Sequence, residues 1–184
     1  MKISSLSKIL GISLLLCSPM IYAEKMVGYD FNQYATKIYT GKKASLKLGD
    51  WKSFRTRLRD AHKDGEIGFA GNYIVSMWGC GTGCLSGAMI DKRSGIIYGL
   101  PIGEDTPYDF GCVHEWENEL DNERVYFTAN SRLFISRNCD AEQIGNSDQY
   151  IEKYTYFINV WDEKAKKFKL IKQVKKSVKT VQDW

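Results

Sequence analysis

Residues 50–65 carry hydrophobic side chains at helical spacing. The apolar side of the predicted helix is formed by Trp51, Phe54, Leu58 and Ala61. We expect Asp50 to cap the start of this helix and Gly65 to end it. The remaining positions carry five basic residues, namely Lys52, Arg55, Arg57, Arg59 and Lys63. Such a run is typical of a solvated helix face, and a docking surface is the less common alternative.

Beyond Gly65 the pattern changes to short runs rich in aromatic and β-branched residues, which are typical of β-strands. Seven runs follow one another, at residues 73–78, 85–90, 96–100, 125–128, 132–136, 154–161 and 168–174. Segments 91–95 and 129–130 have the composition of tight turns, and we expect Gly95 at positive φ. The sequence therefore predicts an α+β, mainly β fold: an antiparallel meander or sandwich of about seven strands with one N-terminal helix.

Three segments lie outside this pattern. Residues 24–49 form a tyrosine-rich leader, which either packs on the domain or stays partly loose. Residues 103–122 have the composition of a long acidic loop, with six acids between Glu104 and Glu119. Residues 164–184 include eight lysines. Here we expect an outer strand whose lysines oppose edge-to-edge pairing, followed by a tail. A patch for a membrane surface or an acidic partner is the alternative.

The first 23 residues are organised like a secretory signal peptide. Lys2 and Lys8 precede an apolar run at residues 9–16, and Ala23 is a small residue at a cleavage point. The run is shorter than the roughly 20 apolar residues that span a bilayer, which disfavours an uncleaved anchor. The large Leu16 disfavours a lipid on Cys17.

We therefore expect a signal peptide at 1–23, a leader at 24–49 and a single disulfide-bonded β-rich domain at 50–184. The mature protein would be periplasmic or secreted, with no transmembrane segment after signal removal. Loss of Lys2 and Lys8 lowers the formal net charge from +4 to about +2, which is not the footprint of a nucleic-acid-binding protein.

Four cysteines remain after signal removal, and an even number in an exported chain predicts two disulfides. Three pairings are possible. We favour Cys80 with Cys84, because the short glycine-rich segment between them can turn tightly, and Cys112 with Cys139. A metal site formed by these cysteines and His114 is disfavoured by their spacing and by the oxidising compartment.

The densest motif is F-A-G-N-Y at residues 69–73, followed by W-G-C-G-T-G-C at 78–84 and D-K-R-S-G at 91–95. Together with residues 54–58, this succession resembles a family of exported bacterial proteins of unassigned function. The resemblance covers about residues 50–100, with weaker echoes at 130–133 and 156–170. It implies a small, secreted, β-rich domain and carries over no catalytic residue.

The motifs indicate no particular reaction. Gly79, Gly81 and Gly83 could offer backbone N–H groups to an anion, but a phosphate loop also needs a strand, a helix and usually a lysine. We interpret them as turn residues beside a disulfide. A redox pair would use C-x-x-C at a helix start, whereas Cys80 and Cys84 are one residue further apart. His114 has acidic neighbours but no accompanying serine elbow. We expect no cofactor and no metal.

These observations favour a non-enzymatic binding protein with a protein partner in the cell envelope. A loop that is held by a disulfide and carries aromatic side chains with a charged rim is suited to a protein–protein interface. An example is an inhibitor or immunity protein against a cell-wall-degrading enzyme. The expected binding residues are Trp78, Thr82, Glu104, Asp105, Glu115, Trp116 and Glu117. A core position is an equally good interpretation of Trp78. The alternative classes are an envelope hydrolase using His114 with nearby carboxylates and a structural envelope component. The sequence indicates no oligomeric state.

Overall fold

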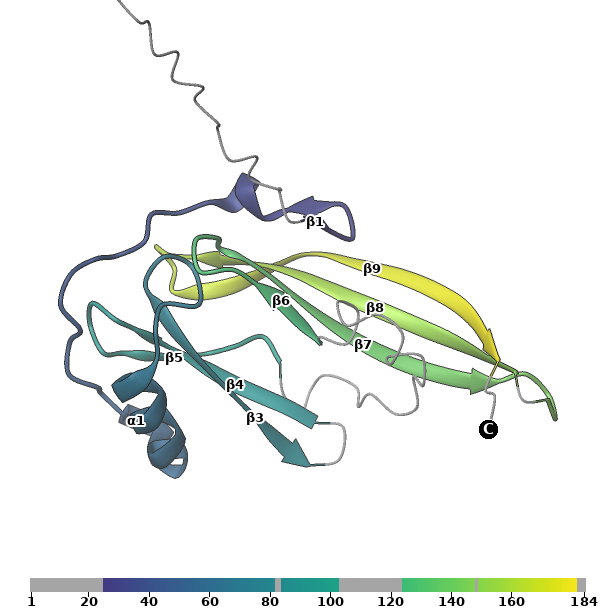
Figure 1. Ribbon diagram of the computed structural model, residues 1–184, viewed down its shortest axis with the longest axis horizontal. Helices are drawn as coiled ribbons and strands as arrows, with labels where there is room; N and C mark the ends of the chain where they lie inside the picture. Colours follow the sequence, from purple (N-terminus) through teal and green to yellow (C-terminus); the bar gives the residue numbers. More distant parts are fainter. Residues whose placement is uncertain (1–24, 82–83, 103–123, 148, 182–184) are drawn as a thin grey trace, which may run out of the picture.

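The computed structural model describes residues 25–81, 84–102, 124–147 and 149–181. Within these residues the chain forms nine strands in three antiparallel sheets and one helix (Figure 1). The fold is therefore α+β and mainly β, as the sequence predicts. All seven predicted runs form strands.

Each of the two larger sheets is a meander, because strands that are neighbours in the chain are also neighbours in the sheet. The three-stranded sheet consists of β3 (Tyr73–Gly81), β4 (Cys84–Asp91) and β5 (Ile97–Gly99). The four-stranded sheet consists of β6 (Val125–Phe127), β7 (Leu133–Gln143), β8 (Gln149–Asp162) and β9 (Lys167–Val181). A small hairpin of β1 (Lys25–Met26) and β2 (Tyr29–Asp30) precedes them.

The two larger sheets pack face to face around an aromatic core. Phe69 lies just before β3 and packs edge-on against Phe134 of β7, with ring centres 5.9 Å apart. Tyr73 of β3 packs edge-on against Trp161 of β8 at 5.3 Å. These four rings are almost completely buried. Successive side chains of a strand point to opposite faces of the sheet. The alternate positions therefore face away from this core. The arrangement is a sandwich.

Each sheet also has a covered outer face. The helix α1 (Arg55–Asp64) buries Leu58 against Ile74 and Ile90 of the three-stranded sheet. On the four-stranded sheet, Phe31 of the 3-10 turn η1 (Phe31–Tyr34) packs against Ile135. The molecule is thus layered as helix, sheet, sheet and N-terminal segment, with α1 and β1 on opposite sides of the sandwich (Figure 1).

The start of the helix differs from the prediction. A 3-10 turn, η2 (Gly49–Phe54), precedes α1, and Asp50 lies inside this turn instead of capping the helix. Phe54 occupies the cap position of α1 and makes no side-chain capping bond. The reason is that Gly49 has φ +51°, so the chain enters through a tight turn. The predicted end is confirmed, since α1 stops before Gly65, where any side chain would overlap the carbonyl oxygen of Ala61.

The segment before the helix is packed on the sandwich, which answers the question that the sequence left open. We call residues 35–48 the strap. Thr36 N donates to Asn130 O at 2.7 Å, and Tyr39 N donates to Gly71 O at the same distance. Lys43 Nζ donates to the carbonyl oxygen of His62 at 2.6 Å, near the C-terminal end of α1. The strap therefore ties the helix to the turns of both sheets.

The strand β9 is longer than predicted and lies at an edge of the four-stranded sheet. Its lysines are placed as expected for an outer strand, and Lys167, Lys169 and Lys172 are exposed. Among the described residues, no helix is both long and apolar enough to cross a membrane.

Candidate functional site

A pocket of about 380 Å³ lies between the strap and one end of the sandwich. Its wall is drawn from five separate parts of the chain. The lining residues are Thr36, Lys37, Ile38, Tyr39 and Thr40 of the strap, Ala70 and Asn72 before β3, Arg93 after β4, Arg132 before β7 and Glu163 after β8. Outside the strap, the lining residues come from four segments that lie beside or between strands, and these segments meet at this one pocket.

The F-A-G-N-Y segment forms a tight turn at the pocket. Phe69 N donates to Tyr73 O at 3.1 Å and Tyr73 N donates back to Phe69 O at 3.0 Å. Between them, Ala70 and Gly71 have φ of +46° and +79°. This conformation is unfavourable for alanine. At Gly71 a side chain would also overlap the carbonyl oxygen of Lys37. The motif thus provides a close contact with the strap that only glycine permits.

Glu163 is the centre of a charged network beside the pocket. Its Oε2 accepts hydrogen bonds from Tyr73 Oη and from Trp161 Nε1, both at 2.7 Å. Its Oε1 accepts from Arg93 and from Lys166. An ionised carboxylate has about four acceptor positions. The carboxylate of Glu163 is therefore fully used by the protein itself.

A second carboxylate, Asp91, fixes the other end of the network. Arg93 binds it with two parallel hydrogen bonds, Nε to Oδ1 at 3.0 Å and Nη2 to Oδ2 at 2.9 Å. Lys166 Nζ lies 3.7 Å from Asp91 Oδ2. The carboxylate is almost completely buried. Paired guanidinium and carboxylate groups of this geometry are strong and directional, so Arg93 is held in one orientation.

The network holds its members in fixed protonation states. Burial alone would raise the pKa of Glu163, but the hydrogen bonds from Lys166, Arg93, Tyr73 and Trp161 outweigh it and lower that pKa to about 2. The pKa of Asp91 also lies below its usual range, because the bonds from Arg93 outweigh desolvation. Burial and the neighbouring Glu163 raise the pKa of Tyr73. At neutral pH both carboxylates are charged and Tyr73 keeps its proton.

Other polar groups of the pocket have hydrogen-bonding capacity to spare. Among the described residues, the Arg132 side chain makes one long bond, from Nη1 to Trp161 O at 3.4 Å, and no ion pair with an acid. Lys37 is exposed and pairs with no described acid either. Asn72 is only 7% exposed, and its Nδ2 is buried without a hydrogen-bond partner. These three side chains offer donors, and the hydroxyls of Thr36 and Thr40 in the same wall can donate or accept.

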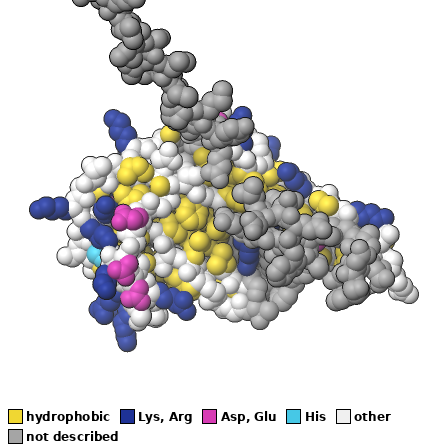
Figure 2. Space-filling model, viewed as in Figure 1, with side chains coloured by type: hydrophobic (Ala, Val, Ile, Leu, Met, Phe, Trp, Pro, Cys, Tyr) yellow, Lys and Arg dark blue, Asp and Glu magenta, His cyan; other side chains and the backbone are white. Residues whose placement is uncertain are grey.

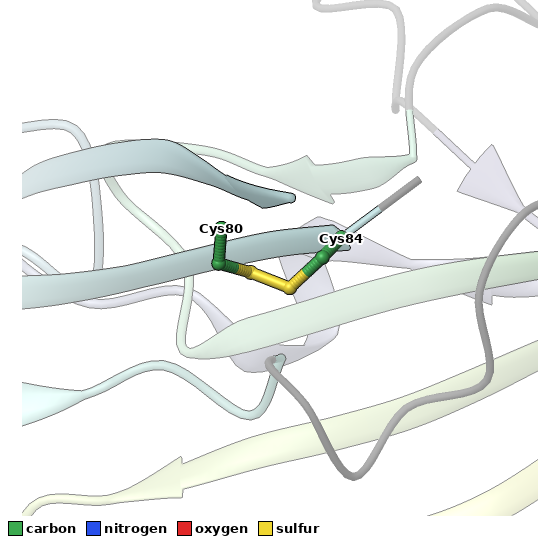
Figure 3. The surroundings of a disulfide bond; sticks show 2 residues. All are labelled: Cys80 and Cys84. Carbon is green, nitrogen blue, oxygen red and sulfur yellow. A yellow bond between two sulfur atoms is a disulfide. The ribbon is translucent and has the colours of Figure 1, made fainter. Parts of the chain in front are cut away.

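The predicted Cys80–Cys84 disulfide is confirmed (Figure 3), with the two Cα atoms 5.1 Å apart at the closed end of the β3–β4 hairpin. Cys139 is buried and also disulfide-bonded. Its predicted partner, Cys112, lies outside the described residues. Trp78 is only 6% exposed and stacks on Phe54 with ring centres 4.7 Å apart. The structure therefore places Trp78 in the core, and its ring offers little surface to a partner.

The other predicted binding residues lie outside the described part of the chain. They are Thr82, Glu104, Asp105, Glu115, Trp116 and Glu117, and His114 of the hydrolase alternative lies there as well. The basic side chains predicted on the helix point to solvent, and Figure 2 shows Lys and Arg gathered where α1 lies. Within the described residues, His, Cys, Asp and Glu do not form a group of three that could hold a metal ion.

None of the protein-family models, curated proteins or solved structures compared with this chain matches it. The candidate site is therefore defined by its own geometry and chemistry.

Proposed function

We propose that this protein is an exported, non-enzymatic binding protein and that the pocket beneath the strap is its binding site. The observation that carries the proposal is that the pocket wall contains two kinds of polar group. One set of charged groups is fully paired and fixed, and a second set of donors remains available. A preformed wall with unused donors is suited to holding a ligand without first rearranging.

The same wall is poorly suited to acid–base catalysis. A general acid or base works best when its pKa lies near the operating pH. Glu163 and Asp91 have pKa values shifted away from neutrality, and so does Tyr73 in the opposite direction. Each also gives its hydrogen-bonding capacity to the network. These groups support the pocket; they are not positioned to exchange protons with a substrate.

Export is the second element of the proposal, and it is supported by the signal-like organisation of residues 1–23. Cleavage after Ala23 would give a mature chain that begins at Glu24 and is found in the periplasmic fraction. N-terminal sequencing of the purified protein tests this. A chain that retains Met1, or a lipid on Cys17, would contradict it.

The binding function can be tested by capture from an envelope extract with the immobilised mature protein. Arg132→Gln removes an available donor of the pocket, and Arg57→Gln removes an exposed charge from α1 as a matched control. We expect the first variant to retain about a tenth or less of the captured ligand and the second to retain all of it. The ligand should keep its mass during prolonged incubation. Equal capture by both variants, or conversion of the ligand to a product, would refute the proposal.

A narrower form of the proposal is an inhibitor or immunity protein whose acidic loop enters the cleft of a cell-wall-degrading enzyme. It is supported by the six acids between Glu104 and Glu119. Converting Glu104, Asp105, Glu115, Glu117 and Glu119 to their amides should then weaken capture of the enzyme about tenfold and reduce its salt dependence. His114→Ala should leave capture unchanged. Under the hydrolase alternative, His114→Ala would instead abolish turnover and spare binding.

A further inference from the structure

The ligand class of the pocket follows from which hydrogen-bonding groups are left over. Glu163 accepts four hydrogen bonds from protein donors, so it has no capacity for a ligand. Asp91 is shielded by Arg93. The charged groups that remain, on Arg132 and Lys37, both donate, whereas the hydroxyls of Thr36 and Thr40 can donate or accept. A pocket whose spare charged groups are all donors favours a ligand that accepts hydrogen bonds.

Asn72 gives the sharpest indication. A buried donor without a partner costs about 1–3 kcal/mol, and Asn72 Nδ2 is such a donor. The residue is fixed by its backbone, since its carbonyl oxygen accepts from Lys92 N at 2.8 Å and it directly follows the constrained Gly71. Asn72 lines the pocket, and an acceptor on a ligand that displaces the atoms covering Nδ2 would satisfy this donor.

Charge indicates that this acceptor is an anion. Glu163 and Asp91 are balanced by Arg93 and Lys166, which pair with both of them. Arg132 and Lys37 add positive charge that no described acid offsets. The ionised Glu163 in the same wall disfavours a doubly charged anion. A planar guanidinium also matches a planar carboxylate through two parallel hydrogen bonds.

We infer that the pocket binds a carboxylate group, with Arg132 as its main partner and Asn72 and Lys37 as further donors; this rests on the proposed binding function and names its ligand class. Ile38 and Tyr39 supply an apolar side to the same pocket. The volume of about 380 Å³ is near the lower end for small-molecule sites. The carboxylate belongs either to a small organic acid or to the free end of a peptide.

The test is a titration of the ¹⁵N-labelled mature protein followed by NMR. The probes are acetate, the peptide Ala-Ala-Ala with a free carboxylate, the same peptide with an amidated end, and inorganic phosphate. We expect acetate and the free peptide to shift the backbone signals of residues 36–40, 72 and 132 in a saturable way. The amidated peptide should leave those signals unchanged. Tighter binding of acetate than of the peptide indicates a small acid as the natural ligand, and the reverse order indicates a peptide end.

Substitutions test which side chains bind the carboxylate. Arg132→Gln should weaken binding of the better probe at least tenfold, and Arg132→Lys, which keeps the charge but loses the planar fork, should lie between it and the wild type. Lys37→Gln, on the exposed strap, should weaken binding about threefold. Arg57→Gln on α1 is the control and should bind like the wild type.

Three results would overturn the inference: equal binding of the amidated peptide, tighter binding of phosphate than of either carboxylate, or no effect of Arg132→Gln and Lys37→Gln. The capture experiment separates this failure from that of the proposed function. If Arg132→Gln loses the captured ligand but no carboxylate probe binds, the pocket is a binding site and only its ligand class is wrong. If capture and titration are both insensitive to Arg132, both proposals fail.

Discussion

The two ends of the β3–β4 hairpin are held together by different means. At the open end, Tyr73 and Asp91 are cross-strand partners, and both belong to the hydrogen-bonded network around Glu163. At the closed end the β3 strand has little packing, because Gly79, Cys80 and Gly81 are exposed. There the Cys80–Cys84 disulfide joins them.

The difference shows how two kinds of crosslink suit two environments. A disulfide needs two close Cα atoms whose Cβ atoms point toward each other, and it stabilises mainly by restricting the unfolded chain. It can therefore secure a hairpin tip that has no core of its own. A buried polar network requires that each member finds its partner. In return, it fixes the direction of charged groups such as Arg93, which a binding site needs.

The largest effect should come from breaking the open end. Trp161 is 1% exposed, packs among Tyr73 and Phe168, and donates to Glu163. Trp161→Ala should lower the free energy of unfolding by about 4 kcal/mol, from the lost packing and the cavity. Trp161→Phe keeps most of the packing and should cost about 1–2 kcal/mol, for the lost donor. Urea denaturation of both variants measures this. Equal losses would mean that the lost hydrogen bond, and not the packing, accounts for the effect, and no loss in Trp161→Phe would mean that packing alone holds this end.

The closed end should be less sensitive. The disulfide at Cys84 encloses a very short loop, and the chain-entropy relation gives about 2 kcal/mol for it. The predicted link from Cys112 to Cys139 encloses a longer segment, for which the same relation gives about 3.5 kcal/mol. Melting curves should thus show a larger loss for Cys112→Ser than for Cys84→Ser. Free thiols in the purified protein, or the reverse order, would contradict this pairing.

A smaller effect should separate two costs of replacing a glycine that has positive φ. One is the backbone strain, and the other is the loss of the contact between the strap and the turn at Gly71. Gly71 and Gly28 both have positive φ, at +79° and +87°, but only Gly71 has a neighbour, the carbonyl of Lys37, where a side chain would lie. Gly28→Ala should cost about 1 kcal/mol for the backbone conformation. Gly71→Ala should cost about 1–2 kcal/mol more, since the strap must move. Thermal unfolding of the two variants checks the difference, and similar losses would show that the strap is not held at Gly71.

The sequence predicts most of the fold, because strands and the helix leave local patterns. Alternation and turn residues identify β3 to β9, and Gly95 indeed adopts positive φ, at +73°. The patterns fail where the local signal is ambiguous. Asp50 resembles a cap but lies within η2, because Gly49 redirects the chain. The outer parts of β8 and β9 extend beyond the predicted runs, since their polar residues and lysines do not alternate with apolar ones.

The pocket is not predicted, for a different reason. Asn72, Arg132 and Glu163 are far apart in the chain and meet only when both sheets pack together. None of them has a spacing that marks it as a site. In the sequence these polar residues lie between hydrophobic runs, as ordinary turn residues do. The predicted acidic binding loop lies outside the described residues and stays a prediction.

The most direct test of the account is the titration of Glu163, because the preference of the pocket for an acceptor ligand depends on that carboxylate being saturated. Its ordinary pKa is 4.5, and in the folded protein it is lowered to about 2. A depressed pKa means that the stabilisation is present above about pH 4.5 and is lost as the pH falls toward 2. The wild type should therefore lose more stability over this range than Glu163→Gln. In a ¹³C NMR titration of the Glu163 side-chain carboxyl, we predict a midpoint near pH 2. A midpoint near pH 4.5 would show that the network does not form and that Glu163 is free to bind a ligand.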